Sequence, residues 1–102
     1  MRRFREKNMD FGSITLTTTL DNFVCDDVYT QSGRKGKRFA GDTPLPEALA
    51  WVHQRIETNG FTYKYTYFRG GEVDVVFEDE NGDEDEYCIV VYLNDYVVVD
   101  EA

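Results

Sequence analysis

The sequence predicts an α+β fold: a mostly antiparallel β-sheet of about five to six strands with one α-helix packed on one face. Short runs that alternate apolar and polar residues predict the strands. One segment, residues 44–59, has apolar residues at helical spacing. Pairs such as Gly70-Gly71 and Asn81-Gly82 separate later runs at hairpin distance. The predicted order is β-β-α-β-β-β-β, and the chain of 102 residues is expected to be a single domain.

The N-terminal part is expected to supply a lead-in, a hairpin and a basic loop. Residues 1–12 are predicted to be a flexible or peripheral lead-in, whereas residues 14–20 alternate Ile and Leu with Thr. This alternation predicts a first strand, and residues 23–31 are expected to return as the second. Residues 32–41 are predicted to be a loop with a short strand near Phe39. The loop contains four basic residues: Arg34, Lys35, Lys37 and Arg38.

A single helix is predicted from about Pro44 to Asn59. Thr43 is a suitable N-cap, and Pro44 suits the first helical position because its missing N–H has no intrahelical acceptor there. Asn59-Gly60 provides a left-handed stop. The apolar residues recur at i, i+3, i+4, i+7 and i+11, as expected for a buried stripe made of Leu45, Ala48, Leu49, Val52 and Ile56.

After Gly60 the sequence predicts four strands in a meander, at residues 61–69, 72–80, 83–93 and 96–99. If Gly70-Gly71 and Asn81-Gly82 are both two-residue loops, the register fixes which side chains share a face. The face toward the helix would carry Phe68, Val73, Val75, Phe77, Cys88, Val90 and Tyr92. The opposite face would carry Tyr63, Tyr65, Tyr67, Asp74, Val76, Glu78, Tyr87, Ile89 and Val91.

Charge is distributed unevenly along the chain. From Glu72 to Ala102 there are twelve carboxylates and neither Lys nor Arg, whereas residues 1–69 hold eleven basic and eight acidic residues. The two parts carry formal charges of −12 and +3, within a net charge of −9. Such a field repels nucleic acid and anionic membranes and attracts basic partners.

The hairpin around Asn81-Gly82 is the candidate binding site. In the two-residue register, three successive rungs pair like charges: Glu80 with Asp83, Asp79 with Glu84, and Glu78 with Asp85. Like charges directly opposite one another destabilise a sheet. This pattern is typical either of a solvated turn protected from aggregation or of a surface that offers carboxylates in place of phosphates to a basic protein. The expected partner-binding residues are the acids Asp74, Glu78, Asp79, Glu80, Asp83, Glu84, Asp85 and Glu86, with Tyr63, Tyr65, Tyr67 and Tyr87 as further contacts.

Other residues with possible chemistry do not form a motif. His53 has no partner at ligand spacing, and Asp26 and Asp27 point to opposite faces of a strand unless a bulge intervenes. The segment 79–86 fails the EF-hand pattern and leaves open only an irregular low-affinity Ca²⁺ site. Cys25 and Cys88 are expected to be buried thiols, with a single disulfide as the alternative. We therefore expect no catalytic residue, no cofactor and no metal site, and the chain is not expected to be an enzyme.

In size and composition the chain resembles small acidic inhibitors carried by phages and mobile elements, including DNA mimics and anti-CRISPR proteins. The resemblance covers composition and size, since no family motif is matched residue by residue. It implies a non-enzymatic inhibitor that binds the basic nucleic-acid-binding site of a host defence complex. The alternatives are an immunity or antitoxin protein that neutralises one basic toxin or nuclease, and a small structural or accessory subunit of a phage particle or larger complex.

The expected partner is thus a basic nucleic-acid-binding protein or a ribonucleoprotein complex, with no direct contact to nucleic acid or membrane. The protein itself is expected to be a monomer or a small homo-oligomer. The N-terminal charges are not followed by an apolar segment, and no apolar run is long enough to cross a bilayer. A cytoplasmic location is therefore expected.

Overall fold

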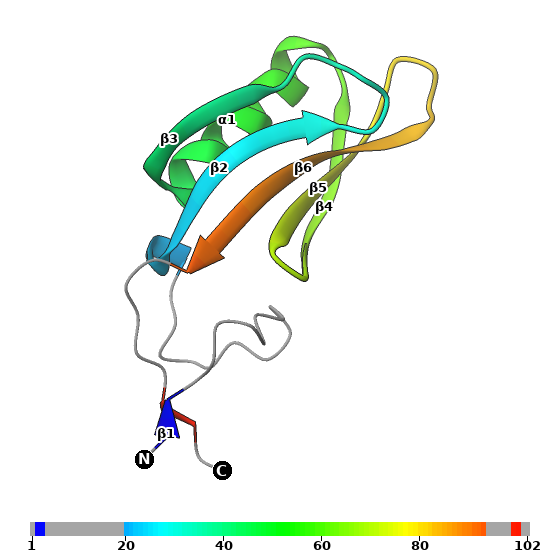
Figure 1. The fold of residues 1–102 in the computed structure, drawn as a ribbon. Coiled ribbons are helices and arrows are strands. Elements are labelled where there is room, and N and C mark those ends of the chain that lie inside the picture. Colours follow the sequence, from blue (N-terminus) through cyan, green and yellow to red (C-terminus); the bar gives the residue numbers. More distant parts are fainter. Residues whose placement is uncertain (1, 4–19, 94–98, 101–102) are drawn as a thin grey trace.

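The computed structural model describes residues 2–3, 20–93 and 99–100, and it confirms the α+β class (Figure 1). A five-stranded antiparallel sheet has the strand order β3-β2-β6-β5-β4, and helix α1 lies on one face of it. The strands are β2 (Phe23–Thr30), β3 (Lys37–Pro44), β4 (Thr62–Arg69), β5 (Glu72–Glu78) and β6 (Glu84–Leu93), and α1 covers Leu45–Thr58. A short 3₁₀ helix, η3 (Leu20–Asn22), precedes β2.

Two predicted strands, at residues 14–20 and 96–99, lie largely outside the described residues, as does most of the lead-in at 1–12. Leu20 belongs to η3, and the dipeptide β1 (Arg2–Arg3) pairs antiparallel with β7 (Val99–Asp100). Within the described ranges, no helix combines the length and the apolar character needed to cross a lipid bilayer.

Strand β2 contains a bulge at Asp26, because its register against both β3 and β6 shifts between Cys25 and Asp27. The bulge brings two acidic side chains to one cation. Arg38 Nη1 lies 3.6 Å from Asp26, and Arg38 Nη2 lies 3.8 Å from Asp27. Strand β3, expected only as a short strand near Phe39, is an edge strand of 8 residues.

Helix α1 begins one residue later than predicted. Pro44 occupies the N-cap position, and no side chain caps the first turn. Thr43, the predicted N-cap, is instead part of β3, where it pairs with Cys25. Strand β3 runs directly into α1 without an intervening loop. The last residue before the helix, Pro44, is therefore extended, which is a conformation that proline favours.

The helix ends as predicted. Gly60 adopts a φ of +74°, and its N–H donates to the carbonyl of Glu57 at 3.0 Å. The N–H of Phe61 donates to the carbonyl of Ile56 at 3.0 Å, which completes a Schellman motif. The predicted apolar stripe faces the sheet: Leu45, Ala48, Val52 and Ile56 are buried and Leu49 is partly buried.

The β4–β5 hairpin has the predicted two-residue loop, since Arg69 pairs with Glu72 across Gly70-Gly71. Further along, β4 contains a bulge between Tyr63 and Tyr65. The bulge changes which face Tyr63 occupies relative to the rest of the strand.

The β5–β6 hairpin differs from the prediction. Glu78 pairs with Glu84, so three residues, 80–82, form the loop rather than Asn81-Gly82 alone. The pairing of β6 is displaced by one residue, and such a displacement moves every side chain of a strand to the other face. The predicted helix face is therefore correct for β5 but wrong for β6. Tyr87, Ile89 and Val91 belong to the core, whereas Cys88 lies on the opposite face.

The hydrophobic core lies between α1 and the sheet. Trp51 of the helix packs edge-to-face against Phe39 and Tyr87, with ring centres 6.2 and 6.1 Å apart. Phe61 stacks on Phe77 with ring centres 4.9 Å apart. Aromatic side chains from the helix and from strands far apart in the sequence thus hold the two layers together.

Gly36 lies close to the backbone of β2, and a Cβ at this position would overlap the carbonyl oxygen of Val28. Gly36→Ala is expected to lower the free energy of unfolding by about 1–3 kcal/mol, because one of the two backbones must move. Gly41→Ala is the matched control, since nothing lies within 4 Å of a Cβ there. Urea denaturation compares the two variants, and equal midpoints would contradict the close approach at Gly36.

Candidate functional site

The acidic hairpin, which we define as residues 78–86, is closed by the side chain of Asp79. Asp79 Oδ1 accepts hydrogen bonds from the N–H of Asn81 at 2.9 Å and of Asp83 at 3.0 Å. The N–H of Gly82 donates to the Asp79 carbonyl at 3.0 Å, and Gly82 has a φ of +81°. This is a type I turn followed by a glycine bulge, a common three-residue hairpin loop. The two backbone N–H groups hold the pKa of Asp79 below its ordinary value of 3.8, so Asp79 has a structural role.

Arg34, from the loop between β2 and β3, is an internal counter-charge for this hairpin. Its Nη2 lies 3.1 Å from Asp79 and 3.3 Å from Glu80, and its Nε lies 3.2 Å from Asp85. Its guanidinium carbon also lies 4.8 Å from the centre of the Phe61 ring. Figure 1 shows the β2–β3 loop and the β5–β6 loop at the same end of the sheet.

These contacts divide the acids of the hairpin into two groups. The side chains of Asp79 and Asp85 are only 10% and 12% exposed and face Arg34. By contrast Glu80, Asp83 and Glu84 are exposed, although Glu80 also contacts Arg34. The outward-facing charge of the hairpin is therefore concentrated in Glu80, Asp83 and Glu84. Glu78, which is half-buried, lies 3.1 Å from Lys64 Nζ.

Two of the predicted tyrosines lie on the open face, which we define as the face of the sheet opposite α1. Tyr65 pairs with Val76 and Tyr67 pairs with Asp74, and their rings are 5.9 Å apart. Tyr65 is 48% exposed. Among the described elements none packs on this face, so Tyr65 is available to a partner.

The other two predicted tyrosines lie on the helix side of the sheet, and the prediction that all four share one face was wrong. Beyond the β4 bulge, Tyr63 pairs with Phe77, and its ring lies 5.0 Å from that of His53 in α1. Tyr87 is 1% exposed and contacts Trp51 and Phe77 in the core. Tyr87 is therefore a core residue.

A shallow hollow of about 240 Å³ lies on the open face at the base of the acidic hairpin. It is lined by Gln31, Tyr65, Val76, Glu84, Asp85 and Glu86. Glu84 and Glu86 lie on the open face, whereas the carboxylate of Asp85 is paired with Arg34. Two carboxylates and one aromatic ring around a hollow are a suitable environment for the cationic head of a lysine or arginine side chain, because the ring adds a cation–π contact to the charge attraction.

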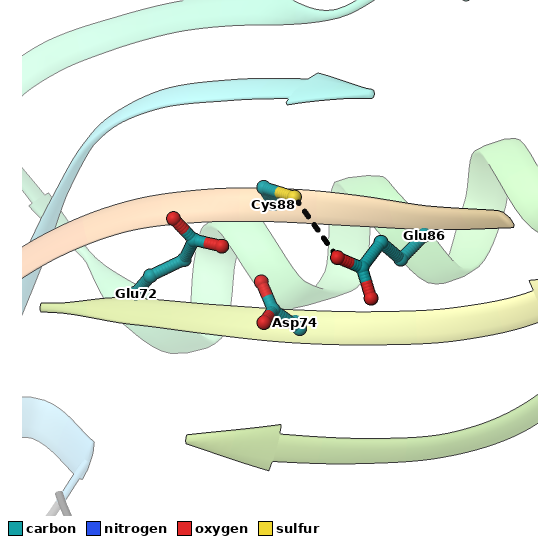
Figure 2. Close-up of side chains that lie close together, drawn as sticks. All are labelled: Glu72, Asp74, Glu86 and Cys88. Atoms are coloured by element: carbon teal, nitrogen blue, oxygen red, sulfur yellow. Dashed lines mark hydrogen bonds between the residues drawn. The ribbon is translucent and has the colours of Figure 1, made fainter. Parts of the chain in front are cut away.

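A second acidic group on the open face was not predicted from the sequence. We call it the carboxylate–thiol cluster, and it consists of Glu72, Asp74, Glu86 and Cys88 (Figure 2). The two-residue register had placed Asp74 and Cys88 on opposite faces. In the structure they are direct partners across β5 and β6, because the three-residue loop displaces the pairing by one residue.

Arg69 flanks this cluster. Its Nη2 lies 3.3 Å from Glu72 and its Nε lies 3.2 Å from Asp74. Asp74 is fully buried. Burial first, and then the neighbouring carboxylates of Glu72 and Glu86, raise the pKa of Asp74 to about 7. The pKa of Glu72 shifts in the opposite direction, below its ordinary value of 4.5, because Asp74 in its protonated form and Arg69 both favour the charged form of Glu72.

No protein-family model, curated protein or solved structure matches this chain. Its function is therefore inferred from the geometry of the open face. That face carries two adjoining features that share Glu86: the hollow beside the exposed acids Glu80, Asp83 and Glu84, and the carboxylate–thiol cluster further along the strands.

Tyr87→Ala is expected to lower the free energy of unfolding by about 3–5 kcal/mol, because it removes a large ring from the packed core. Tyr65→Ala, on the open face, is expected to change it by less than about 0.5 kcal/mol. Urea denaturation followed by near-ultraviolet circular dichroism measures both. Similar destabilisation by the two variants would contradict the assignment of these tyrosines to different sides of the sheet.

The raised pKa of Asp74 predicts that the stability of the metal-free protein depends on pH. EDTA in the buffer keeps metal ions away from the carboxylates during this measurement. The unfolded chain releases this proton near pH 3.8 and the folded protein near pH 7, so the folded state binds more protons in between. The free energy of unfolding should therefore fall as pH rises from 5 to about 7.5. The lowered pKa values of Glu72 and Asp79 act in the opposite direction, but below this range.

Asp74→Asn is the control for this measurement, because asparagine has the same shape and no titratable proton. The free energy of unfolding of Asp74→Asn should therefore change less with pH over the same range. Parallel curves for the two proteins between pH 5 and 7.5 would show that Asp74 does not titrate there.

Proposed function

We propose that the protein is a non-enzymatic inhibitor that binds the basic nucleic-acid-binding site of another protein and prevents nucleic acid from entering it. The observation that carries this proposal is the acidic hollow on the open face, where Glu84 and Glu86 lie beside the exposed ring of Tyr65. A nucleic-acid-binding protein holds the phosphates with Lys and Arg side chains. Side chains of this kind are the ones that the hollow can accept.

The surroundings of the hollow support the same partner chemistry. Glu80 and Asp83 extend the negative surface beyond Glu84 to the tip of the hairpin. Arg34 forms ion pairs with Asp79 and Asp85 on the side of the hairpin away from the open face. These ion pairs restrain the conformation of the loop in the free protein. A preformed acidic surface loses little conformational freedom on binding, and its field accelerates encounter with a basic protein.

The biological setting is part of the proposal. A host defence complex that binds nucleic acid in the cytoplasm is the partner that the acidic composition and small size favour, with the protein acting as a DNA mimic of the anti-CRISPR type. The net charge of −9 supports a basic partner and disfavours direct binding to nucleic acid or to an anionic membrane.

An immunity or antitoxin protein against one basic nuclease is the second candidate, and the exposed ring of Tyr65 favours it. A single shape-matched partner would depend more on Tyr65 and Tyr67 than on total charge. Tyr65→Ala would then weaken binding more than the loss of several exposed carboxylates. The affinities of Tyr65→Ala and of the hairpin charge variants for the natural partner therefore separate the two candidates.

The triple variant Glu80→Lys, Asp83→Lys, Glu84→Lys tests the proposal, because all three residues are exposed. The control triple is Asp42→Lys, Glu47→Lys, Glu57→Lys, which changes the net charge equally at exposed positions outside the hairpin. Fluorescence anisotropy with a labelled deca-arginine peptide at low salt measures binding. The hairpin triple is expected to bind about tenfold more weakly than the control triple, since each exposed ion pair contributes about 0.5 kcal/mol.

The natural partner is then sought by pull-down from host lysate at low and high salt, and the bound protein is tested for displacement of labelled nucleic acid. The wild-type protein and the control triple should displace the nucleic acid, and the hairpin triple should not. Equal affinity of the two triples for the peptide, with equal displacement, would overturn the proposal.

A further inference from the structure

The carboxylate–thiol cluster has the geometry of a metal site. Glu72 and Asp74 come from β5, and Glu86 and Cys88 come from β6 (Figure 2). One ligand atom from each of these four side chains lies within 4.8 Å of the others. Tetrahedral zinc with bonds of about 2.0–2.3 Å places its ligand atoms about 3.3–3.8 Å apart. The four side chains would thus need to move inward by only about 1 Å, which rotation of their χ angles can supply.

Asp74 gives an independent indication that the cluster takes a ligand. Its side chain is fully buried, and no geometrically suitable hydrogen bond reaches Oδ1 or Oδ2 from the described residues. Arg69 Nε is close to Oδ2 at 3.2 Å but is not aligned for a hydrogen bond. In Figure 2 the Asp74 carboxyl group points into the space between Glu72, Glu86 and Cys88. A buried carboxylate without hydrogen-bond partners is costly unless a cation or a proton neutralises it.

The cluster contains more negative than positive charge, so an additional cation would be stabilising. Three carboxylates converge on this point, and Arg69 supplies one positive charge from a side chain that is 57% exposed. A divalent ion would neutralise the excess negative charge, and Arg69 could remain at the edge or turn outward. Arg69 is therefore both the present partner of the cluster and the competitor of any bound metal.

The outer hydrogen bonds of the cluster are those expected around metal ligands. Tyr29 Oη donates to Glu72 at 3.4 Å, and Tyr67 Oη donates to Glu86 at 3.3 Å. Such bonds to ligating carboxylates orient them and are common around metal sites. Tyr29 reaches Glu72 from β2 and Tyr67 reaches Glu86 from β4, so four strands of the sheet contribute to the arrangement.

We propose that Glu72, Asp74, Glu86 and Cys88 bind a divalent transition-metal ion, with zinc the best match to the donor set. A thiolate favours zinc over calcium and magnesium, which select oxygen ligands, and zinc accepts carboxylate oxygens beside sulfur. Binding breaks the S–H bond of Cys88: the proton leaves to solvent, and the sulfur electron pair forms the metal–sulfur bond. The metal would join β5 to β6 and stabilise the register that places the hairpin.

Cobalt(II) is the probe, because a thiolate bound to cobalt gives a charge-transfer absorption in the near ultraviolet. Titration of the full chain, after treatment with a chelator and a reductant, is expected to give this absorption with a stoichiometry of one. Added zinc should remove it, and a large excess of calcium or magnesium should not. Absence of the absorption, or its removal by calcium, would overturn the proposal.

Variants show which residues hold the ion. Cys88→Ser is expected to remove the thiolate absorption, whereas Cys25→Ser is the matched control at the other buried thiol and should retain it. Asp74→Asn should weaken cobalt binding at least tenfold. Arg69→Gln should strengthen it, because the competing cation is gone. Circular dichroism of each variant confirms that it is folded.

Two results would contradict the proposal at the level of residues: loss of the absorption in Cys25→Ser with retention in Cys88→Ser, or equal affinity of wild type and Asp74→Asn for cobalt. The proposed metal site and the proposed inhibitor function are tested independently, so one can be wrong while the other is right. The cobalt titration uses the isolated protein, and Glu80, Asp83 and Glu84, which test the inhibitor function, are not among the four ligands.

Discussion

The three-residue loop of the β5–β6 hairpin is the constraint on which the rest of the structure depends. Gly82 at positive φ and the hydrogen bonds that Asp79 accepts from the backbone favour a type I turn with a glycine bulge over a two-residue turn. The loop decides which side chains of β6 face the helix, and a change of one residue would exchange the two faces. It buries Tyr87 in the core and places Cys88 beside Asp74 on the open face.

Two arginines balance much of the acidic character that the sequence concentrates after Glu72. Arg34 reaches the hairpin loop from the loop that follows β2, and Arg69 reaches the carboxylate–thiol cluster from the end of β4. Most of the acids that they hold are buried or half-buried, whereas Asp83 and Glu84 face solvent, as does Glu80 despite its contact with Arg34. The proposed binding surface lies where the carboxylates face outward, and the carboxylates with a structural role are not part of it.

Local patterns in the sequence were sufficient for much of the fold. The helix, its buried stripe and its stop at Asn59-Gly60 follow from spacing and turn chemistry, as do β2, β4, β5 and β6 to within a few residues. The class and the element order around the helix were therefore predictable. The hairpin register was not, because Asn81-Gly82 fits both a two-residue turn and the end of a three-residue loop, and the choice depends on the Asp79 side chain.

The candidate site was predictable in composition but not in arrangement. The acids of the hairpin were identified from charge alone, but the contacts of Arg34 join residues 45 and 51 positions apart in the chain, and no local pattern reports such pairs. The tyrosines alternate along β4 as a strand predicts, yet the bulge before Tyr65 moves Tyr63 to the helix side. The carboxylate–thiol cluster exists only in the correct register, so it could not be found before that register was known.

The most direct test of this account is the cross-strand register of β5 and β6 in solution, measured by nuclear Overhauser contacts between backbone protons. Directly opposite residues in a non-hydrogen-bonded antiparallel pair have Cα atoms about 4.5 Å apart, which brings their Hα protons into close contact. The account predicts a strong contact between the Hα protons of Asp74 and Cys88. Contacts that link Cys88 to Val75 and Asp74 to Ile89 instead would contradict it.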